Sequence, residues 1–586
     1  MTAYPKRFAA THCLPLALIL LTTFAGTATA AFVRVARDGD SIAGGATLLD
    51  FSLPILNNAG DILVQARFDA DGDGSSDGQV LLRCAAGGTV HEIARTGDVL
   101  STGATISSFN TVGATGIHIL ADNGRAAFQV ISMDVGGRII LSGVGGAPTV
   151  YLSEGDPVPG STTGETVKDA QIIGYTDTGV FVYSYKPSRP GFTGFLEIWR
   201  GAARLAYTGH PYAGTVTRAF NRGWVTDGGD VLVSGEVVSP GVDPTVWFRP
   251  FEGELIPIVD DQTPAPAGST FELGVYAGGI FYNGPSSLGF VSKLFGLPYG
   301  EDYAAFFSGG GTPTELLRIS FPGPDGGTYN SVDMWDFNDF NESLIHATWR
   351  VPGSLTSYDE LLRMTPTGLG TRIAAEAQPD PDATGLFGNF AEGAMNDAGQ
   401  VAFLGVVKVG GTSTNALLWW DGQNLSTLAQ EGRAFDGQVL TSVGFAGRVG
   451  GHINRSALNA DGQVAFLAES EGQKAVYRYD PDSTVDVPLP GSNLPRIMLK
   501  SVAPNPFNPR TTITYSLSAP TRVAAVIYDL AGRAVRTLMD EPESAGVHRL
   551  VWNGVDDGGA ALASGTYFCR ISSPDADLIA KLVLLK

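Results

Sequence analysis

Cysteine is scarce in this sequence, and its scarcity limits how the protein can be stabilised. The chain has 586 residues and three cysteines. Cys13 lies in the N-terminal segment, while Cys84 and Cys569 fall in different expected domains. The disulfide framework with which many secreted domains replace a large core is therefore not expected. We expect Cys84 and Cys569 to be buried as small hydrophobic residues, and stability to come from apolar burial.

Positive charge and long apolar runs are also in short supply. Lys and Arg number 38 against 59 Asp and Glu, a formal net charge of −21. Nucleic acid is not expected as a partner, because binding to phosphates requires clustered Lys and Arg. After the N-terminal segment no apolar run is long enough to cross a bilayer, so no transmembrane segment is expected in the mature chain. With 76 Gly and 34 Pro, the composition indicates a turn-rich globular protein.

Catalytic motifs are not recognisable either. The histidines that follow the N-terminal segment are scattered and lack metal-ligand spacing: His91, His118, His210, His346, His452 and His548. No Gly-x-Ser-x-Gly nucleophile elbow and no phosphate loop occurs. Distant loops of a repeat protein can bring carboxylates together for hydrolysis. The candidates are Asp98, Asp156, Asp336 and Asp397, and capping of turns is the simpler explanation for all four. We expect no enzymatic activity.

The N-terminus has the three parts of a secretory signal. Lys6 and Arg7 precede the apolar run Leu14–Leu21, and small residues follow up to an Ala-x-Ala site at Ala28–Ala30. We therefore expect residues 1–30 to be removed on export and the mature chain to begin at Ala31.

The long middle of the chain repeats a turn followed by a strand. Well-formed copies of the turn are Asn57–Val64, Asp122–Phe128, Thr176–Val182, Thr226–Val233, Asn338–Ile345, Asn396–Phe403 and Asn459–Phe466, with a degenerate copy at Asn283–Phe290. Gly60, Gly124, Gly179 and Gly229 are 64, 55 and 50 residues apart, and Gly399 and Gly462 are 63 apart. A period of this size predicts a repeat architecture.

Each copy follows the same physical logic. Asn, Asp or Thr opens a tight turn, and we expect its side chain to bond the backbone two residues further on. Gly then supplies the positive φ. In the strand after it, Val401 and Phe403 are expected on one face and Ala402 on the other. A further strand follows, as in Val80–Arg83, Glu197–Arg200 and Ala475–Tyr479, and a third precedes a Gly-Asp or Pro-rich turn.

Three or four strands per repeat without helical periodicity predict an all-β, propeller-like domain of seven or eight blades over residues 31–487. Phe32–Asp40 is a lone copy of the third strand, which indicates that it completes the last blade and closes the ring. An open solenoid or a string of sandwiches is the alternative. The repeat resembles a family of bacterial exported proteins with tandem Asn-x-x-Gly-x-x-Ala-Phe repeats. The pattern is complete in Asn396–Phe403 and carries one insertion in Asn459–Phe466.

One loop has the composition of a calcium site. Asp69, Asp71, Asp73 and Asp77 take positions one, three, five and nine of an EF-hand-type loop, and Gly74 takes position six. Position twelve is Val80, so the bidentate Glu is missing and we expect weak affinity, with a Kd of about 10⁻⁴–10⁻³ M. The alternative is a solvated acidic hairpin tip. No other cofactor is expected.

The C-terminal segment carries four motifs in order: Ser501–Leu517, Val526–Leu538, Gly546–Asp556 and Leu562–Phe568, followed by Lys581–Lys586. Thr512, Thr514 and Ser516 alternate with apolar residues, as in a half-buried strand. Short strands at this spacing predict a small β-sandwich over residues 497–586, after a linker at 488–496. The segment resembles the C-terminal sorting domain of type IX secretion cargo, which is related to the Ig-like module of the flagellar hook-capping family. An Ig-like module with no sorting role is the alternative.

These observations predict an exported protein that acts as a binding or structural platform. The resemblance implies that its C-terminal domain engages the outer-membrane secretion machinery and delivers it to the bacterial surface or releases it. A glycan or a protein is the expected extracellular ligand. A secreted hydrolase acting on polysaccharide is the second hypothesis, and clustered Asp, Glu, Tyr and Trp at one mouth of the ring would favour it.

Overall fold

The computed structural model describes residues 31–585 apart from 110–117, 146, 159–163, 177, 189–196, 227–228, 240–244, 252–253, 262, 266–267, 274–277, 285, 448–455, 482–496, 504, 506, 518–520, 530–532, 544–545 and 573–576. The expected signal peptide and the expected linker at 488–496 lie outside the described residues. The chain divides into two compact units, residues 1–484 and 485–586. In the described part of the chain, no helix is long and apolar enough to cross a membrane.

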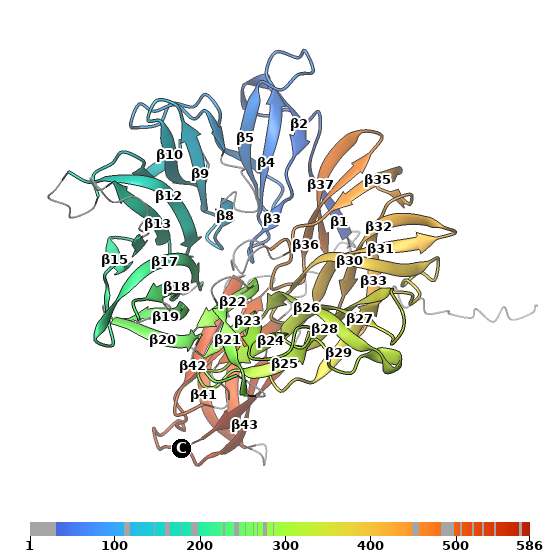
Figure 1. The fold of residues 1–586 in the computed structure, drawn as a ribbon. Helices are drawn as coiled ribbons and strands as arrows, with labels where there is room; N and C mark the ends of the chain where they lie inside the picture. Colours follow the sequence, from blue (N-terminus) through green and yellow to red (C-terminus); the bar gives the residue numbers. More distant parts are fainter. Residues whose placement is uncertain are drawn as a thin grey trace, which may run out of the picture. The chain divides into compact units, whose positions relative to one another are not determined.

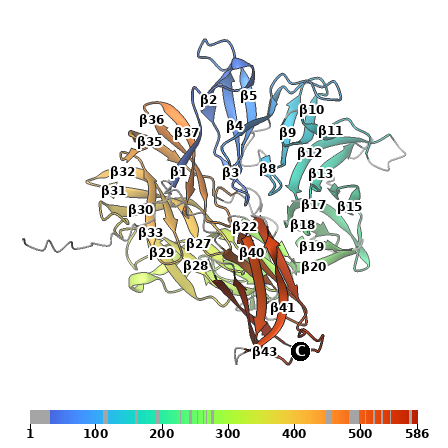
Figure 2. The same ribbon diagram turned by 180° about the vertical axis from the view of Figure 1, so that it is seen from behind.

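The first unit is a ring of antiparallel sheets, as predicted. Eight sheets follow one another along its described residues, and we call them blades 1 to 8. They are arranged around a common centre, toward which the short strands β3, β8 and β22 lie (Figures 1 and 2). This confirms the propeller-like fold, and eight is the larger of the two predicted blade numbers.

The strands of the first four blades have the following bounds. Blade 1 contains β2 (Thr47–Phe51), β3 (Ile55–Leu56), β4 (Ile62–Asp69), β5 (Gly78–Cys84) and β6 (Val90–Arg95). Blade 2 contains β7 (Ser108–Phe109), β8 (His118–Leu120), β9 (Ala126–Ser132), β10 (Gly137–Gly143) and β11 (Thr149–Ser153). Blade 3 contains β12 (Thr166–Tyr175), β13 (Phe181–Ser188), β14 (Glu197–Arg200) and β15 (Ala203–Ala206). Blade 4 contains β16 (Pro211–Tyr212), β17 (Thr215–Val225), β18 (Val231–Val237), β19 (Thr245–Phe251) and β20 (Glu254–Asp260).

The remaining blades repeat this order. Blade 5 contains β21 (Thr270–Glu272), β22 (Gly278–Gly284), β23 (Ser287–Phe295), β24 (Tyr303–Ser308) and β25 (Thr314–Arg318). Blade 6 contains β26 (Thr328–Phe337), β27 (Ser343–Arg350), β28 (Ser357–Met364) and β29 (Gly370–Ala375). Blade 7 contains β30 (Leu386–Met395), β31 (Val401–Val409), β32 (Thr412–Trp420) and β33 (Leu425–Gln430). Blade 8 contains β34 (Ala434–Phe435), β35 (Gln438–Gly444), β36 (Val464–Ser470), β37 (Gln473–Asp480) and, from the other end of the unit, β1 (Ala31–Arg37).

Strand β1 closes the ring, which confirms the prediction made from the lone N-terminal strand. It pairs antiparallel with β37, with Ala31 facing Asp480 and Arg37 facing Ala475. It occupies the fourth-strand position of blade 8, which lacks a fourth strand of its own. The first and last strands of the unit are therefore neighbours in one sheet.

The second strand of each blade lies between two cores, and the predicted alternation in β31 is confirmed. Val401, Ala402 and Phe403 are all 0% exposed. Val401 and Phe403 belong to the apolar cluster shared with blade 6, whereas Ala402 belongs to the cluster shared with blade 8. The alternation therefore separates two inter-blade cores, because each sheet of a closed ring packs between two others.

The second unit is a small β-sandwich, as predicted. One sheet contains β38 (Ile497–Ala503), β39 (Thr511–Leu517) and β42 (Gly546–Trp552); the other contains β40 (Thr521–Tyr528), β41 (Ala534–Glu543), β43 (Gly565–Ser572) and β44 (Asp577–Leu584). Side chains of both sheets form one core, in which Ile513, Trp552 and Ile527 are buried. Cys569 in this core and Cys84 in the ring are buried free thiols, as expected.

Candidate functional site

The turn between the first and second strands is the element on which the centre of the ring is built. Its first residue is, from blade 1 to blade 8, Asn57, Ala121, Thr176, Thr226, Asn283, Asn338, Asn396 and Asn459. In blade 7 the N–H of Gly399 donates to the carbonyl of Asn396 over 2.9 Å, and Gly399 has a φ of 72°. Asn341 takes the glycine position in blade 6 with a φ of 64°, a conformation that Asn tolerates.

The side chain of the first residue caps the turn. Asn57 Oδ1 accepts from the N–H of Asp61 over 2.8 Å, and Asn396 Oδ1 accepts from the N–H of Gln400 over 3.0 Å, in each case four residues further on. Asn338 and Asn459 make the same bond and also the predicted one, from the N–H two residues further on, over 3.1 Å in both turns. This leaves the amide nitrogen of each Asn available for another partner.

That amide nitrogen reaches the next blade. Asn396 Nδ2 donates to the carbonyl of Asn459 over 3.0 Å, and Asn459 Nδ2 donates to the carbonyl of Asn57 over 3.1 Å. Asn57 and Asn338 donate in the same way to Ala121 over 2.8 Å and to the carbonyl of Asn396 over 3.2 Å. We call this series the asparagine ring. It joins residues about one repeat apart and, between Asn459 and Asn57, opposite ends of the unit.

The second residue of the turn adds a second hydrogen bond with the same direction from blade to blade. Asp122 Oδ1 accepts from the backbone N–H of Asn58 over 2.7 Å, and Asn58 Oδ1 accepts from that of Ala460 over 2.9 Å. Asp397 Oδ1 likewise accepts from the N–H of Asp339 over 2.9 Å. Each of these neighbouring turns therefore donates two hydrogen bonds to the turn of the next blade, one from a side chain and one from the backbone.

An arginine on the third strand packs against the turn glycine of the next blade. Arg478 Nη1 donates to the carbonyl of Gly60 over 2.7 Å, and Arg200 Nη1 donates to that of Gly229 over 2.9 Å. A β-carbon at Gly124 would lie 2.6 Å from the guanidinium of Arg83. The turn glycine is thus required for its positive φ and also for close approach. The sequence analysis missed this role, although Arg83 and Arg200 end strands that it quoted.

A cavity of about 360 Å³ lies where the turns meet. Turn residues and the residues just before them line it, including the carboxylates Asp122, Asp336, Asp339 and Asp397. Its described lining contains no Lys, Arg, His, Glu, Tyr or Trp. The cavity therefore combines a negative charge with hydrogen-bonding groups, and its local field favours groups of positive charge.

The carboxylates that could have served hydrolysis are all placed, and each one accepts a backbone hydrogen bond. Asp336 is 1% exposed and accepts from the N–H groups of Phe337 and Met395, both over 2.7 Å. Asp98 and Asp156 each accept from the N–H three residues before, over 2.8 Å. Asp336 and Asp397 line the central cavity, whereas Asp98 and Asp156 cap turns that follow β6 and β11.

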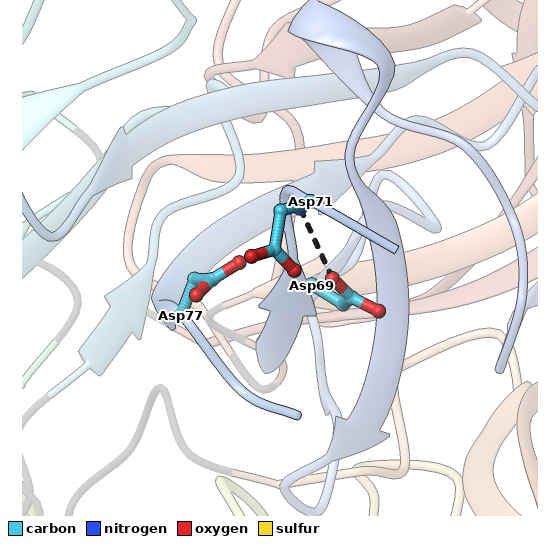
Figure 3. Close-up of side chains that lie close together, drawn as sticks. All are labelled: Asp69, Asp71 and Asp77. Carbon is cyan, nitrogen blue, oxygen red and sulfur yellow. Dashed lines mark hydrogen bonds between the residues drawn. The ribbon is translucent and has the colours of Figure 1, made fainter. Parts of the chain in front are cut away.

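The acidic loop is the hairpin tip between β4 and β5. Carboxylate oxygens of Asp69, Asp71 and Asp77 lie within 4.8 Å of one another. Figure 3 shows the three side chains side by side. Asp73 is not in this group, and its Oδ1 accepts from the N–H of Ser75 over 2.6 Å. Val80, at the twelfth position of the loop, is 0% exposed in β5 and offers no ligand.

Asp69 is the best-anchored carboxylate of the loop. It accepts from the N–H of Gly74 over 2.8 Å, of Gly72 over 2.7 Å and of Asp71 over 3.1 Å. These backbone bonds, that of Gly74 foremost, lower the pKa of Asp69 below its usual value. Asp69 is therefore a preformed anion at the base of the loop, with Asp71 and Asp77 beside it. Three convergent carboxylates fit a hard cation such as calcium.

Comparison with protein families identifies the first unit. Residues 26–122 and 120–481 match the model of a family of unknown function, DUF7453. The chain belongs to this family. Residues 508–577 of the second unit match the FlgD Ig-like domain, which agrees with the β-sandwich. No curated protein matches the chain.

Solved structures resemble this DUF7453 member only distantly. PorZ, a surface component of the type IX secretion system of Porphyromonas gingivalis, has 10% identity and a TM-score of 0.31, over 93% of this chain and 74% of that one. The Dos1 propeller has 9% identity and a TM-score of 0.34, over 76% and 94%. An oligogalacturonate lyase of Vibrio parahaemolyticus has 11% identity and a TM-score of 0.33, over 75% and 98%. Similarity this low carries no argument about function.

Proposed function

We propose that this protein is an exported bacterial surface protein whose eight-bladed ring is a binding platform. The observation that carries the proposal is the central cavity, with its polar, acidic lining and its rigid frame of hydrogen-bonded turns. The frame supplies a preformed site, which lowers the entropy lost on binding. The ligand is an extracellular protein or glycan that presents hydrogen-bond donors or positive charge to Asp122, Asp339 and Asp397.

A platform accounts for the cavity better than a polysaccharide hydrolase does. Hydrolysis of a glycosidic bond requires a carboxylic acid and a carboxylate that face the sugar. Asp336 is instead buried with both carboxylate oxygens accepting from backbone N–H groups. Asp122 and Asp397 accept from the N–H groups of neighbouring turns, and their carboxylates have further acceptor capacity for a ligand. A panel of extracellular polysaccharides tests this point. Release of reducing ends by the wild-type protein, but not by a variant with Asp397→Asn, would show that the protein is a hydrolase rather than a binding platform.

The second unit is proposed to direct export. The four C-terminal motifs and the match to the FlgD Ig-like domain support a sorting role at the outer membrane. A chain truncated after Pro490 should accumulate in the periplasm, whereas the full chain should reach the surface. Fractionation and protease shaving of intact cells measure both locations. Normal delivery of the truncated chain would exclude the sorting role and leave the platform intact.

Calcium is proposed as a weak ligand of the acidic loop, held by Asp69, Asp71 and Asp77. The support is the convergence of their carboxylate oxygens. Bound there, a calcium ion would neutralise the mutual repulsion of three carboxylates and order the tip of the β4–β5 hairpin.

A further inference from the structure

The strand that closes the ring buries fewer side chains than the fourth strand of any other blade except β15 of blade 3, which also buries one. Among the described side chains of β1, Phe32 to Arg37, Ala36 alone is buried, while Phe32 and Val33 are 39% and 40% exposed. The fourth strands of blades 6 and 7, β29 and β33, bury three residues each. The β1–β37 pair joins the two ends of the unit by hydrogen bonds alone, without a covalent connection inside the sheet. This pair is therefore shallowly packed.

Most contacts that hold β1 are made with blade 8, although Ala36 also belongs to the apolar cluster that contains Leu48 of blade 1. The backbone pairs with β37, and Arg34 forms an ion pair with Asp436 over 2.9 Å. The ring of Phe32 lies 4.9 Å from that of Phe435 and 5.3 Å from that of Tyr479. Residues 38–46 connect β1 covalently to β2 of blade 1. Blade 8 of any other copy offers an identical set of contacts.

We propose that β1 is exchangeable, so that blade 8 of one molecule accepts β1 of a second copy in the same register. Release of β1 exposes the edge of β37, and a free sheet edge recruits a strand. A second copy is the fitting donor, because its Phe32 and Arg34 match the positions of Phe435, Tyr479 and Asp436. Exchange keeps all contacts of the closed ring, so its extent depends on protein concentration and on the conformation of residues 38–46.

Two single-cysteine variants of the full chain test the exchange. Arg37 faces Ala475 in the β1–β37 pair, so a disulfide between an Arg37→Cys copy and an Ala475→Cys copy reports β1 of one copy paired with β37 of the other, and it is counted above the dimer that each variant forms alone. We expect disulfide-linked dimers on a non-reducing gel after concentration and mild oxidation, in an amount that rises with concentration. A mixture of Arg37→Cys with Thr441→Cys, an exposed position of blade 8 that does not face β1, should give several-fold fewer. The native thiols Cys84 and Cys569 are buried and do not interfere.

A chain carrying both Arg37→Cys and Ala475→Cys verifies the geometry. It should form an internal disulfide and remain monomeric when oxidised in dilute solution, which shows that the two positions meet and that the variants fold. If this internal disulfide forms while the mixed single variants give no more dimer than the Thr441→Cys mixture, exchange between copies is excluded.

Discussion

The asparagine ring makes a quantitative prediction for Asn396, which is 7% exposed at the junction of blades 7 and 8. An Asn396→Ala substitution removes the bond to the carbonyl of Asn459, the bond from the N–H of Gln400 and the bond to Gln400 Oε1. A buried hydrogen bond contributes about 1 kcal/mol, and an abandoned partner adds to the loss. We expect a destabilisation of about 3 kcal/mol.

The expected change in melting temperature follows from the size of the unit. An entropy of unfolding of about 2.1 cal/mol/K per residue, over about 450 residues, makes 3 kcal/mol equivalent to about 3 °C. Differential scanning calorimetry resolves such a shift. Asn389→Ala, on an exposed position of β30 in the same blade, is the matched control and should change the stability by less than about 0.5 kcal/mol.

Asn396→Asp separates the two functions of the side chain. The carboxylate keeps an acceptor for the N–H of Gln400 but cannot donate to the carbonyl of Asn459. We therefore expect Asn396→Asp to keep the turn cap and to lose the two bonds that Nδ2 donates, to the carbonyl of Asn459 and to Gln400 Oε1. If Asn396→Ala and Asn396→Asp both melt within error of the Asn389→Ala control, hydrogen bonding between turns does not stabilise the ring, and apolar packing between blades accounts for it.

Three further predictions concern the closing strand, the acidic loop and one buried carboxyl. Deletion of residues 31–37 should lower the melting temperature and promote association, because it bares the edge of β37; unchanged melting and a monomeric elution profile would contradict this. With a Kd of ~1 mM, ~10 mM calcium should stabilise the protein by about 1.4 kcal/mol. Asp71→Asn should abolish that increment and Asp73→Asn should retain it, and equal effects would move the site elsewhere. Burial raises the pKa of Glu392 and outweighs the hydrogen bond from the N–H of Gly447, which lowers it. The contribution of Glu392 to stability is therefore present at low pH and is lost as the pH rises through the folded pKa. Glu392→Gln should therefore flatten the fall in melting temperature as the pH rises above the ordinary glutamate pKa of about 4.5, and an unchanged slope would assign the dependence to other groups.

The architecture could be predicted because the pattern that identifies each repeat lies within a short stretch of sequence. Turn chemistry and strand alternation occupy eight consecutive residues, such as Asn396–Phe403, and seven well-formed copies fix a period. The lone strand at Phe32 stood out because it had the pattern of a repeat without the rest of one. The blade with which this strand pairs also followed from the topology, because in a closed ring an unpaired first strand can only complete the last blade.

The site was harder to predict because its bonds join different repeats. Nothing within Asn396–Phe403 reveals that Asn396 donates to a carbonyl 63 residues away. The turn cap uses the side-chain oxygen of Asn396, which leaves the amide nitrogen to donate that bond. Arg83 and Arg478 carried a signal that a comparison of aligned repeats can find, namely an arginine near the end of the third strand. The convergence of Asp69, Asp71 and Asp77 depends on how one loop bends, which spacing alone does not determine.

Closure by β1 also decides how the ring responds to mechanical force. Since β1 and β37 are antiparallel, Ala31 faces Asp480, and the chain enters and leaves the domain at adjacent points. Tension between these two points acts at one end of the pair, so its hydrogen bonds rupture one after another rather than together. A surface protein pulled between a fixed C-terminal unit and a contact near Ala31 would thus open its ring at the β1–β37 pair under a small force. The same force applied across any other blade would leave the strands of that blade paired.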